Sequence, residues 1–340
     1  MKRFVAPALL VSRMADLVTL DIGQTPAETL YTENKVRLLQ YESATDGRHD
    51  TPILLVYAVI NRPYILDLQS ERSVVRQFIE RGFDVYLLDW GEPTRLDTAL
   101  GFEDYVERYL AHAVDVVRNQ SGRASIHLFG YCTGGTLATI FAALHPDVIR
   151  TLGLLAPILS FETDEGILKT WGREWHVEPE MVSETFGNAP GELLATEFSK
   201  QDPVEFYLAR YLRLAEHLDD REYVERALRR LRWGQETVDV PGRLYGEFLR
   251  DLYREDRLMA NDLIVGGKHV DLDQLRMPIL DILGTEDRFI PAAASLPFMD
   301  TVPSPDTTVI EFPTDHIGLS VGEHAHAELW PTICDWYGER

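Results

Sequence analysis

Short apolar runs, separated by helical stretches, constrain this chain more than any other feature of its sequence. Each run is nearly continuous in apolar residues and ends at turn-forming or polar residues. The six runs are Pro52–Ile60, Asp84–Trp90, Ser125–Phe129, Thr151–Ala156, Pro278–Leu283 and Thr308–Phe312. Such runs are typical of strands buried on both faces, as in parallel sheets.

Helical patterns lie between these runs. They cover Glu71–Arg81, Phe102–Asn119, Thr136–Leu144 and Ala325–Tyr337. Strands that alternate with helices form right-handed βαβ units. The sequence therefore predicts an α/β fold with a mostly parallel central sheet that helices cover on both faces.

One long region breaks this alternation. Residues 161–266 hold no strong strand candidate, and helical segments are predicted at Val204–His217, Arg221–Arg232 and Pro241–Glu255. An insertion at the carboxyl edge of an α/β sheet usually covers a pocket. We therefore expect a helical cap at 161–266, an α/β core at 51–160 and 267–340, and an N-terminal helical and loop segment at 1–50.

Charge limits the partners of the chain. Its 340 residues include 55 acidic and 33 basic residues, a formal charge of −22. Such a field repels phosphate and disfavours non-specific binding to nucleic acid or anionic membranes. Only five of the basic residues are lysines, a pattern expected of a protein that works in high salt, although a GC-rich genome would also favour arginine.

The two cysteines and the N-terminus bear on location. Cys132 and Cys334 form no disulfide framework and no metal-binding spacing, so we expect a reducing cytoplasm. The apolar run Phe4–Val11 resembles a signal peptide, but Pro7 interrupts it and its only A-x-A match lies inside the run, so export is not expected. No stretch reaches about 18 apolar residues, so no membrane span is predicted.

A candidate nucleophile follows the third apolar run. Gly130-Tyr131-Cys132-Thr133-Gly134-Gly135 leads from the strand into a helix, the arrangement of a nucleophile elbow with cysteine in place of serine. A buried structural cysteine is the alternative, but the flanking glycines favour a nucleophile. We expect the backbone N–H of Thr133 to form one half of an oxyanion hole and Ile60 or Asn61 to supply the other.

A base and an acid follow in the order that this arrangement requires. Asp287 lies just past the fifth run, with Glu286 and Asp281 as alternative acids, and His316 follows the sixth run 29 residues later. Carboxyl ends of parallel strands meet at one sheet edge, so these groups are predicted to converge on Cys132. A thiolate there suits acyl transfer from a thioester.

The motifs together resemble the polyhydroxyalkanoate (PHA) synthases, and most closely the short catalytic subunit of the class III type (PhaC-like). The lipase-like box G-x-C-x-G-G is Gly130–Gly135. Further matches are VYAVINRPYILDLQSERS at 56–73, Asp89-Trp90-Gly91, Asn188–Glu192, Gly266–Leu272 and His316-Ile317-Gly318. Thr314-Asp315 departs from the Gly-Gly that usually precedes the final histidine in this family.

The resemblance implies an α/β-hydrolase fold with a helical cap and the polymerisation of (R)-3-hydroxyacyl-CoA, of short chain such as 3-hydroxybutyryl-CoA, with release of CoA. Cys132 would be the covalent nucleophile, His316 the base and Asp287 the third member. No cofactor or metal is expected. A homodimer, a second synthase subunit (PhaE-like) and a location on cytoplasmic polyester granules are also implied.

Substrate contacts are open at this stage. Arg62, Arg72 and Arg254 are candidates for the CoA phosphates. The cap is rich in aromatic residues that would keep water out of the site or simply pack its core, namely Trp171, Trp175, Phe186, Phe198, Phe206, Tyr207, Tyr211, Trp233, Tyr245 and Phe248.

Two other functions remain open on the residues alone. The same triad would serve a hydrolase, such as a thioesterase, a PHA depolymerase or a dienelactone-hydrolase-like enzyme. A non-catalytic granule-associated subunit could keep the fold, although the presence of Cys132, Asp287 and His316 together argues against it.

Overall fold

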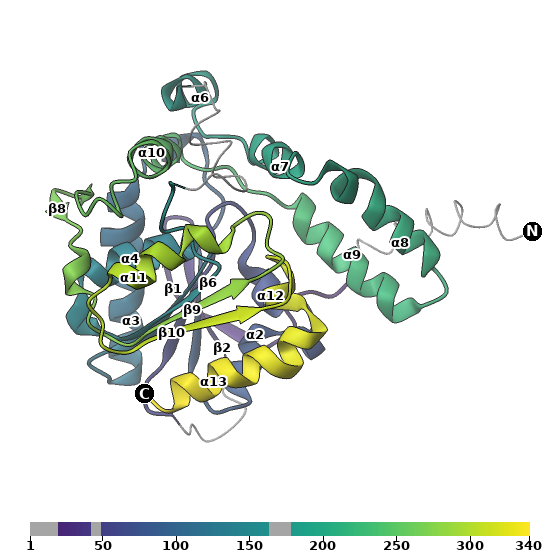
Figure 1. The fold of residues 1–340 in the computed structure, drawn as a ribbon, viewed down its shortest axis with the longest axis horizontal. Helices are drawn as coiled ribbons and strands as arrows, with labels where there is room; N and C mark the ends of the chain where they lie inside the picture. Colours follow the sequence, from purple (N-terminus) through teal and green to yellow (C-terminus); the bar gives the residue numbers. More distant parts are fainter. Residues whose placement is uncertain (1–19, 42–48, 163–177) are drawn as a thin grey trace, which may run out of the picture.

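An eight-stranded sheet forms the centre of the computed structural model, which describes residues 20–41, 49–162 and 178–340 (Figure 1). The strand order is β1-β2-β4-β3-β5-β6-β9-β10, and all pairs from β4 to β10 are parallel. The strands are β1 Ala27–Glu33, β2 Val36–Tyr41, β3 Ile53–Val56, β4 Val85–Asp89, β5 Ile126–Tyr131, β6 Ile149–Leu155, β9 Ile279–Gly284 and β10 Thr307–Phe312. All six predicted strands and the mostly parallel sheet are confirmed.

The prediction of helix and loop for residues 1–50 is wrong where the structure describes this segment. β1 and β2 form an antiparallel hairpin, and β2 pairs antiparallel with β4. Asn34, at a φ of 52°, turns the chain between them. On β2, Val36 and Leu38 are buried while Arg37 is exposed, an alternation of period two that is typical of a half-buried strand. Residues 1–19 and 42–48 lie outside the described part.

Helices cover both faces of the sheet. Figure 1 shows α3 (Ala111–Ser121) and α4 (Thr133–Leu144) on one side, with α2 (Val74–Ile79) and α13 (Trp330–Gly338) on the other. The four predicted helical stretches are confirmed, with shifted bounds. The remaining core segments are η2 Pro63–Asp67, η3 Ser70–Arg72, η4 Arg95–Asp97, η5 Glu103–Leu110, η6 Pro146–Val148, η10 Leu272–Gln274, η11 Ala292–Ala294, α11 Leu296–Thr301, α12 Gly318–Val321 and η12 Ala325–Leu329.

Helices dominate the chain between β6 and β9. They are α6 Pro179–Phe186, α7 Gly191–Ser199, η8 Glu205–Ala209, α8 Arg210–Glu216, α9 Arg221–Gln235, α10 Gly242–Glu247 and η9 Phe248–Arg254. The short pair β7 Ile264–Val265 and β8 Lys268–His269 follows, so the strand-free region ends slightly earlier than predicted. Trp171 and Trp175 lie outside the described residues.

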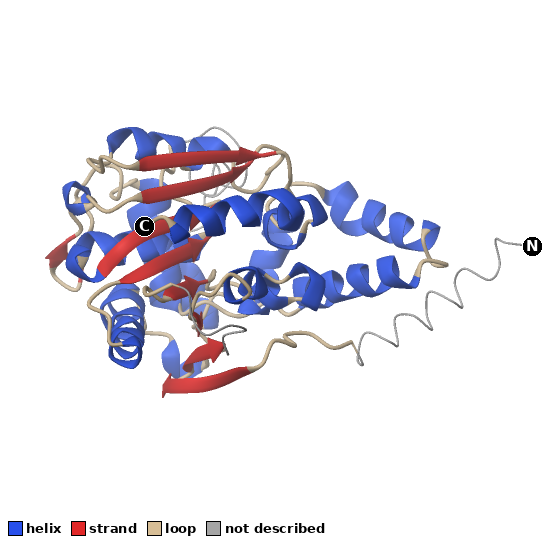
Figure 2. Ribbon diagram, turned by 90° about the horizontal axis from the view of Figure 1, so that it is seen from below, coloured by secondary structure: helices blue, strands red, loops and turns tan. Residues whose placement is uncertain are grey.

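Residues 205–235 form a helical arm that extends beyond the sheet (Figures 1 and 2). The arm consists of η8 with α8, followed by α9. Leu214, Leu218, Val224 and Leu228 form its own small apolar core. Within the described residues, no helix is long and apolar enough to cross a membrane.

Candidate active site

The turn between β5 and α4 holds Cys132 in a conformation that few side chains adopt. Its φ is 56° and its ψ is −128°. A Cβ on Gly130 would lie 2.5 Å from the Cα of Gly135, and a Cβ on Gly134 would lie 2.3 Å from the carbonyl oxygen of Val56. Both distances are too short for any atom, so glycine is required for this tight turn. The predicted nucleophile elbow is therefore present.

Cys132 is nearly buried and lies at the start of a helix. The residue is 5% exposed, and α4 begins at the next residue. The N-terminal end of a helix carries partial positive charge, which favours a negative sulfur atom. The backbone N–H of Cys132 donates to Leu155 O at 3.0 Å, so the elbow is tied to the neighbouring strand β6.

His316 and Asp287 form a buried pair across the loops that follow β10 and β9. The distance from His316 Nδ1 to Asp287 Oδ2 is 2.6 Å. The backbone N–H groups of Phe289 and Ile290 both donate to Asp287 Oδ1 at 2.9 Å. The side chain of Asp287 is fully buried and that of His316 is 9% exposed. These contacts hold the carboxylate in one orientation toward the imidazole.

The charge of Asp287 sets the proton affinity of His316. Burial by itself would lower the pKa of His316, but the Asp287 carboxylate, Tyr131, and hydrogen bonds to Asp287 and Cys132 raise that pKa well above its usual value. The Tyr131 hydroxyl also donates to His316 O at 2.5 Å. A basic imidazole hydrogen-bonded to a thiol is the group that can remove the thiol proton.

The two alternative acids differ from Asp287 in their surroundings. Glu286 is exposed at the edge of the pocket. Asp281 lies inside β9, where Ser295 Oγ donates to its Oδ2 at 2.5 Å, and burial raises the pKa of Asp281 to about 7. Asp287 is the one of these three carboxylates that bonds to His316.

The loop after β3 lies against the elbow, as the oxyanion prediction requires. The N–H of Val59 donates to Thr133 Oγ1 at 3.3 Å, and Ile60 and Asn61 line the same pocket as Cys132. Asn61 uses its Oδ1 to accept the N–H of Arg62 at 2.7 Å. The assignment of Thr133, Ile60 and Asn61 as oxyanion donors stays a prediction.

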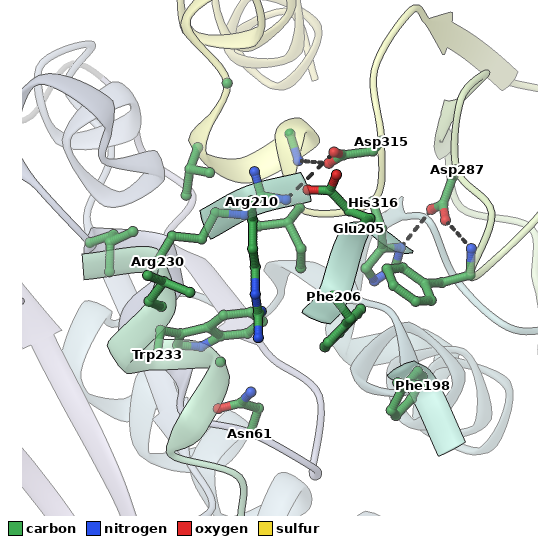
Figure 3. Close-up of a pocket in the computed structure, with 18 of the residues that line it drawn as sticks. Asn61, Phe198, Glu205, Phe206, Arg210, Arg230, Trp233, Asp287, Asp315 and His316 are labelled. Carbon is green, nitrogen blue, oxygen red and sulfur yellow. Dashed lines mark hydrogen bonds and ion pairs between the residues drawn. The ribbon is translucent and has the colours of Figure 1, made fainter. Parts of the chain in front are cut away.

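A pocket of about 1050 Å³ joins the three candidate catalytic residues to the arm (Figure 3). This volume is at the upper end of the range for small-molecule sites. Of the cap aromatics, Phe198, Phe206 and Trp233 line it. Phe289 also contributes, with its ring 6.2 Å from that of His316. The rings of Phe198 and Phe206 lie 5.9 and 6.3 Å from that of Phe289, so these three residues form an apolar side of the pocket close to the triad.

The predicted phosphate-binding arginines fall into two groups. Arg72 lines the pocket, whereas Arg62 and Arg254 are not among its lining residues and pair with Glu92 and Glu178. The sequence analysis missed five other arginines that line the pocket: Arg210, Arg213, Arg226, Arg230 and Arg288. For Arg226 and Arg230, the arginine-rich segment REYVERALRRLRW, which becomes α9, was an available signal.

Comparison with solved structures defines the class of protein first. A putative lipase from Sulfolobus solfataricus matches with a TM-score of 0.58 and 15% identity, covering 94% of this chain and 98% of that one. A variant of monoglyceride lipase from Saccharomyces cerevisiae matches with a TM-score of 0.53, 12% identity and coverages of 94% and 96%. The alpha/beta hydrolase fold family model matches residues 51–323. The chain therefore has the α/β-hydrolase fold, as predicted.

Sequence relatives define the particular family. The model described as poly-beta-hydroxybutyrate polymerase (PhaC) N-terminus matches residues 8–78. The poly(3-hydroxyalkanoate) polymerase subunits PhaC of Haloferax mediterranei and Allochromatium vinosum are 51% and 34% identical, each over 94% of this chain. The chain spans 65% of the Haloferax protein and 90% of the Allochromatium protein. It belongs to the poly(3-hydroxyalkanoate) polymerase subunit PhaC family, which confirms the resemblance.

Proposed function

We propose that this chain polymerises (R)-3-hydroxyacyl-CoA, of short chain such as 3-hydroxybutyryl-CoA, into polyester through an acyl-Cys132 intermediate. The observation that carries the proposal is the strained elbow that presents Cys132 to the buried His316–Asp287 pair inside a large pocket. The family relationship supports the same reaction.

In the first half-reaction, His316 takes the proton of the Cys132 thiol through Nε2, because Nδ1 is engaged by Asp287. The thiolate attacks the thioester carbonyl, and the oxyanion rests on the Thr133 N–H and a donor from the loop at Ile60 and Asn61. The bond from carbon to the CoA sulfur breaks, and His316 returns the proton to that sulfur. The products are free CoA and an acyl-cysteine.

In the second half-reaction, His316 takes the proton of the 3-hydroxyl of another hydroxyacyl unit. The hydroxyl oxygen attacks the acyl-cysteine carbonyl, an ester bond forms and the carbon–sulfur bond to Cys132 breaks. The thiolate recovers its proton from His316. Every step is acid–base or acyl transfer, so the reaction consumes no cofactor.

Water competes with the hydroxyl in the second half-reaction, and hydrolysis is therefore the alternative activity. The apolar side of the pocket, formed by Phe198, Phe206 and Phe289, favours ester formation because it excludes water near the acyl-cysteine. The organisation implied by the family includes a homodimer or a second, PhaE-like subunit and a position at the granule surface, and these remain part of the proposal.

Incubation with 3-hydroxybutyryl-CoA separates the two activities. The synthase releases CoA and forms insoluble polyester, whereas a hydrolase releases CoA with an equal amount of free hydroxy acid. Cys132→Ala is expected to abolish CoA release in either case, and full release by that variant would refute the nucleophile. The assay is run with and without a candidate second subunit and over a series of salt concentrations.

A further inference from the structure

The proposed substrate and the charge of the chain oppose each other. A CoA thioester carries a diphosphate and a phosphomonoester, and the chain carries a formal charge of −22. Long-range electrostatics therefore disfavour the encounter, so the pocket needs local cations that can accept phosphate. The pocket lining differs from the rest of the chain in this respect, because among the described residues arginines and carboxylates line it in equal number, six of each.

Most of these arginines are already neutralised by a carboxylate. Arg213 pairs with Glu205 through two hydrogen bonds, and Arg288 pairs with Asp202 at 2.8 Å. Arg230 lies 3.5 Å from Asp315, and both of these side chains are about half exposed. Such pairs have little charge left for a ligand unless they break.

Arg210 differs from these paired arginines in its surroundings. Among the residues that the structure describes, no carboxylate lies within 4.0 Å of its guanidinium, and its Nε is buried without a hydrogen-bond partner. The guanidinium carbon lies 4.9 Å from the ring centres of both Phe206 and Tyr211, and one terminal nitrogen donates to the Tyr211 hydroxyl at 3.2 Å. The aromatic rings hold the cation in place while most of its donors remain available.

Two more arginines line the same pocket, and each pairs with a glutamate. Arg72 and Arg226 are 19% and 24% exposed, and their partners Glu323 and Glu222 are largely exposed. Burial and the nearby charge of Arg226 lower the pKa of Arg72, whereas the charges of Glu323 and Glu222 raise it. Because exposed ion pairs are weak, a phosphate can replace these glutamates and be shared by the two guanidinium groups.

We propose that Arg210 binds a phosphate group of the CoA moiety, with Arg72 and Arg226 contacting a further phosphate, so that the arm and η3 together form the CoA-binding part of the pocket. This inference rests on the proposed function for the identity of the ligand. A guanidinium presents two parallel N–H groups that match a phosphate, and its weak hydration suits a partly buried site.

Figure 3 supports this division of the pocket. Arg210 and Arg230 lie on the side where Trp233 also lies, and the His316–Asp287 pair lies toward the other side in this view. The acyl group would then face the triad while the phosphates face the arm.

Binding of CoA to protein with Cys132→Ala tests the proposal without any turnover. Isothermal titration compares CoA, dephospho-CoA and pantetheine as ligands. With Arg210→Gln added, we expect CoA to bind at least tenfold more weakly while pantetheine binding is unchanged, because pantetheine has no phosphate. Arg210→Lys keeps the positive charge but lacks the planar guanidinium, so its affinity for CoA should lie between those of the parent and of Arg210→Gln. A selective loss for CoA over dephospho-CoA would assign Arg210 to the phosphomonoester.

The matched control is Arg221→Gln, which removes one positive charge from a well-exposed site on α9 that does not line the pocket. We expect CoA binding within twofold of the parent. The proposal is overturned if Arg210→Gln leaves CoA binding unchanged, if it weakens CoA and pantetheine equally, or if Arg221→Gln has the same effect. Failure of the proposed reaction would instead appear as absence of CoA release by the unmodified protein.

Discussion

Replacement of Asp287 by Asn removes one negative charge from the centre of the site while keeping its shape. The amide oxygen can still accept the N–H groups of Phe289 and Ile290, which now donate to Asp287 Oδ1 at 2.9 Å. The amide nitrogen would then face His316 Nδ1 in place of the carboxylate oxygen 2.6 Å away. Two donors cannot share this contact, so His316 must carry its proton on Nε2, which faces Cys132.

The loss should be large because His316 in that tautomer cannot accept the thiol proton. An Asp→Asn change in a serine protease triad lowers kcat by about 10⁴ for the same reason. We expect a fall of that order here, equivalent to about 5 kcal/mol of transition-state stabilisation. The pKa of His316 should also fall, because burial then acts without the opposing charge of Asp287.

Stability should change with pH in a defined direction. The folded-state pKa of His316 lies above its unfolded value, so protonated His316 beside Asp287 stabilises the fold. This contribution is fully present below a pH of about 6.5 and is lost as pH rises through the folded-state pKa. Asp287→Asn removes this contribution, about 3 kcal/mol for a broken buried pair. The difference in unfolding free energy between the two proteins should therefore be greatest near pH 6 and should shrink at higher pH.

The assays are the initial rate of CoA release and urea unfolding, each from pH 6 to 10. Glu286→Gln is the matched control, because it removes the same charge one residue away from an exposed side chain. We expect its rate within about twofold of the parent. The reasoning fails if Asp287→Asn keeps more than a tenth of the activity, or if Glu286→Gln loses as much.

Three further substitutions test residues that support the candidate active site without belonging to the triad. Gly134→Ala places a Cβ 2.3 Å from Val56 O, so it should displace the elbow and lower both kcat for CoA release and the yield of soluble protein. A soluble variant with full activity would contradict this prediction. Tyr131→Phe leaves His316 O without its buried donor and should cost about 1–3 kcal/mol of unfolding free energy in urea melts, whereas an unchanged midpoint would contradict it. The pKa of Asp281 is raised to about 7, so protonated Asp281 stabilises the fold fully below the unfolded-state pKa near 4, and this contribution is lost as pH rises through 7. Asp281→Asn should therefore flatten the dependence of the unfolding free energy on pH between about 4 and 7. An unchanged slope in that range would refute the role.

Local sequence was sufficient for the parallel strands and the elbow. Buried parallel strands need apolar side chains on both faces, so they appear as continuous runs, and the tight turn at Cys132 needs glycine at fixed positions. The β1–β2 hairpin was missed because β1 is mostly exposed and has no clear alternation, and because its turn, Asn34-Lys35, lacks the glycine that usually marks a two-residue hairpin.

The position of charged side chains was much harder to predict. Arg62 and Arg254 looked as suitable as Arg72, yet each meets a carboxylate away from the pocket lining. The aromatic neighbours of Arg210, Phe206 and Tyr211, are close to it in sequence, but the absence of a carboxylate partner among the described residues and the pocket that it faces depend on the fold. Which arginine keeps its charge for a ligand depends on which carboxylates the fold brings within reach.

The sequence by itself determined the fold class and the position of the elbow, and it predicted the nucleophile and the order of the triad, because strand burial, the strained turn and the positions after strand ends are local properties of the chain. Only the tertiary structure decided that Asp287, rather than Glu286 or Asp281, bonds to His316, and that the arm brings Arg210 to the pocket. Those choices depend on distances of a few ångströms between segments far apart in the chain, and such distances follow from packing.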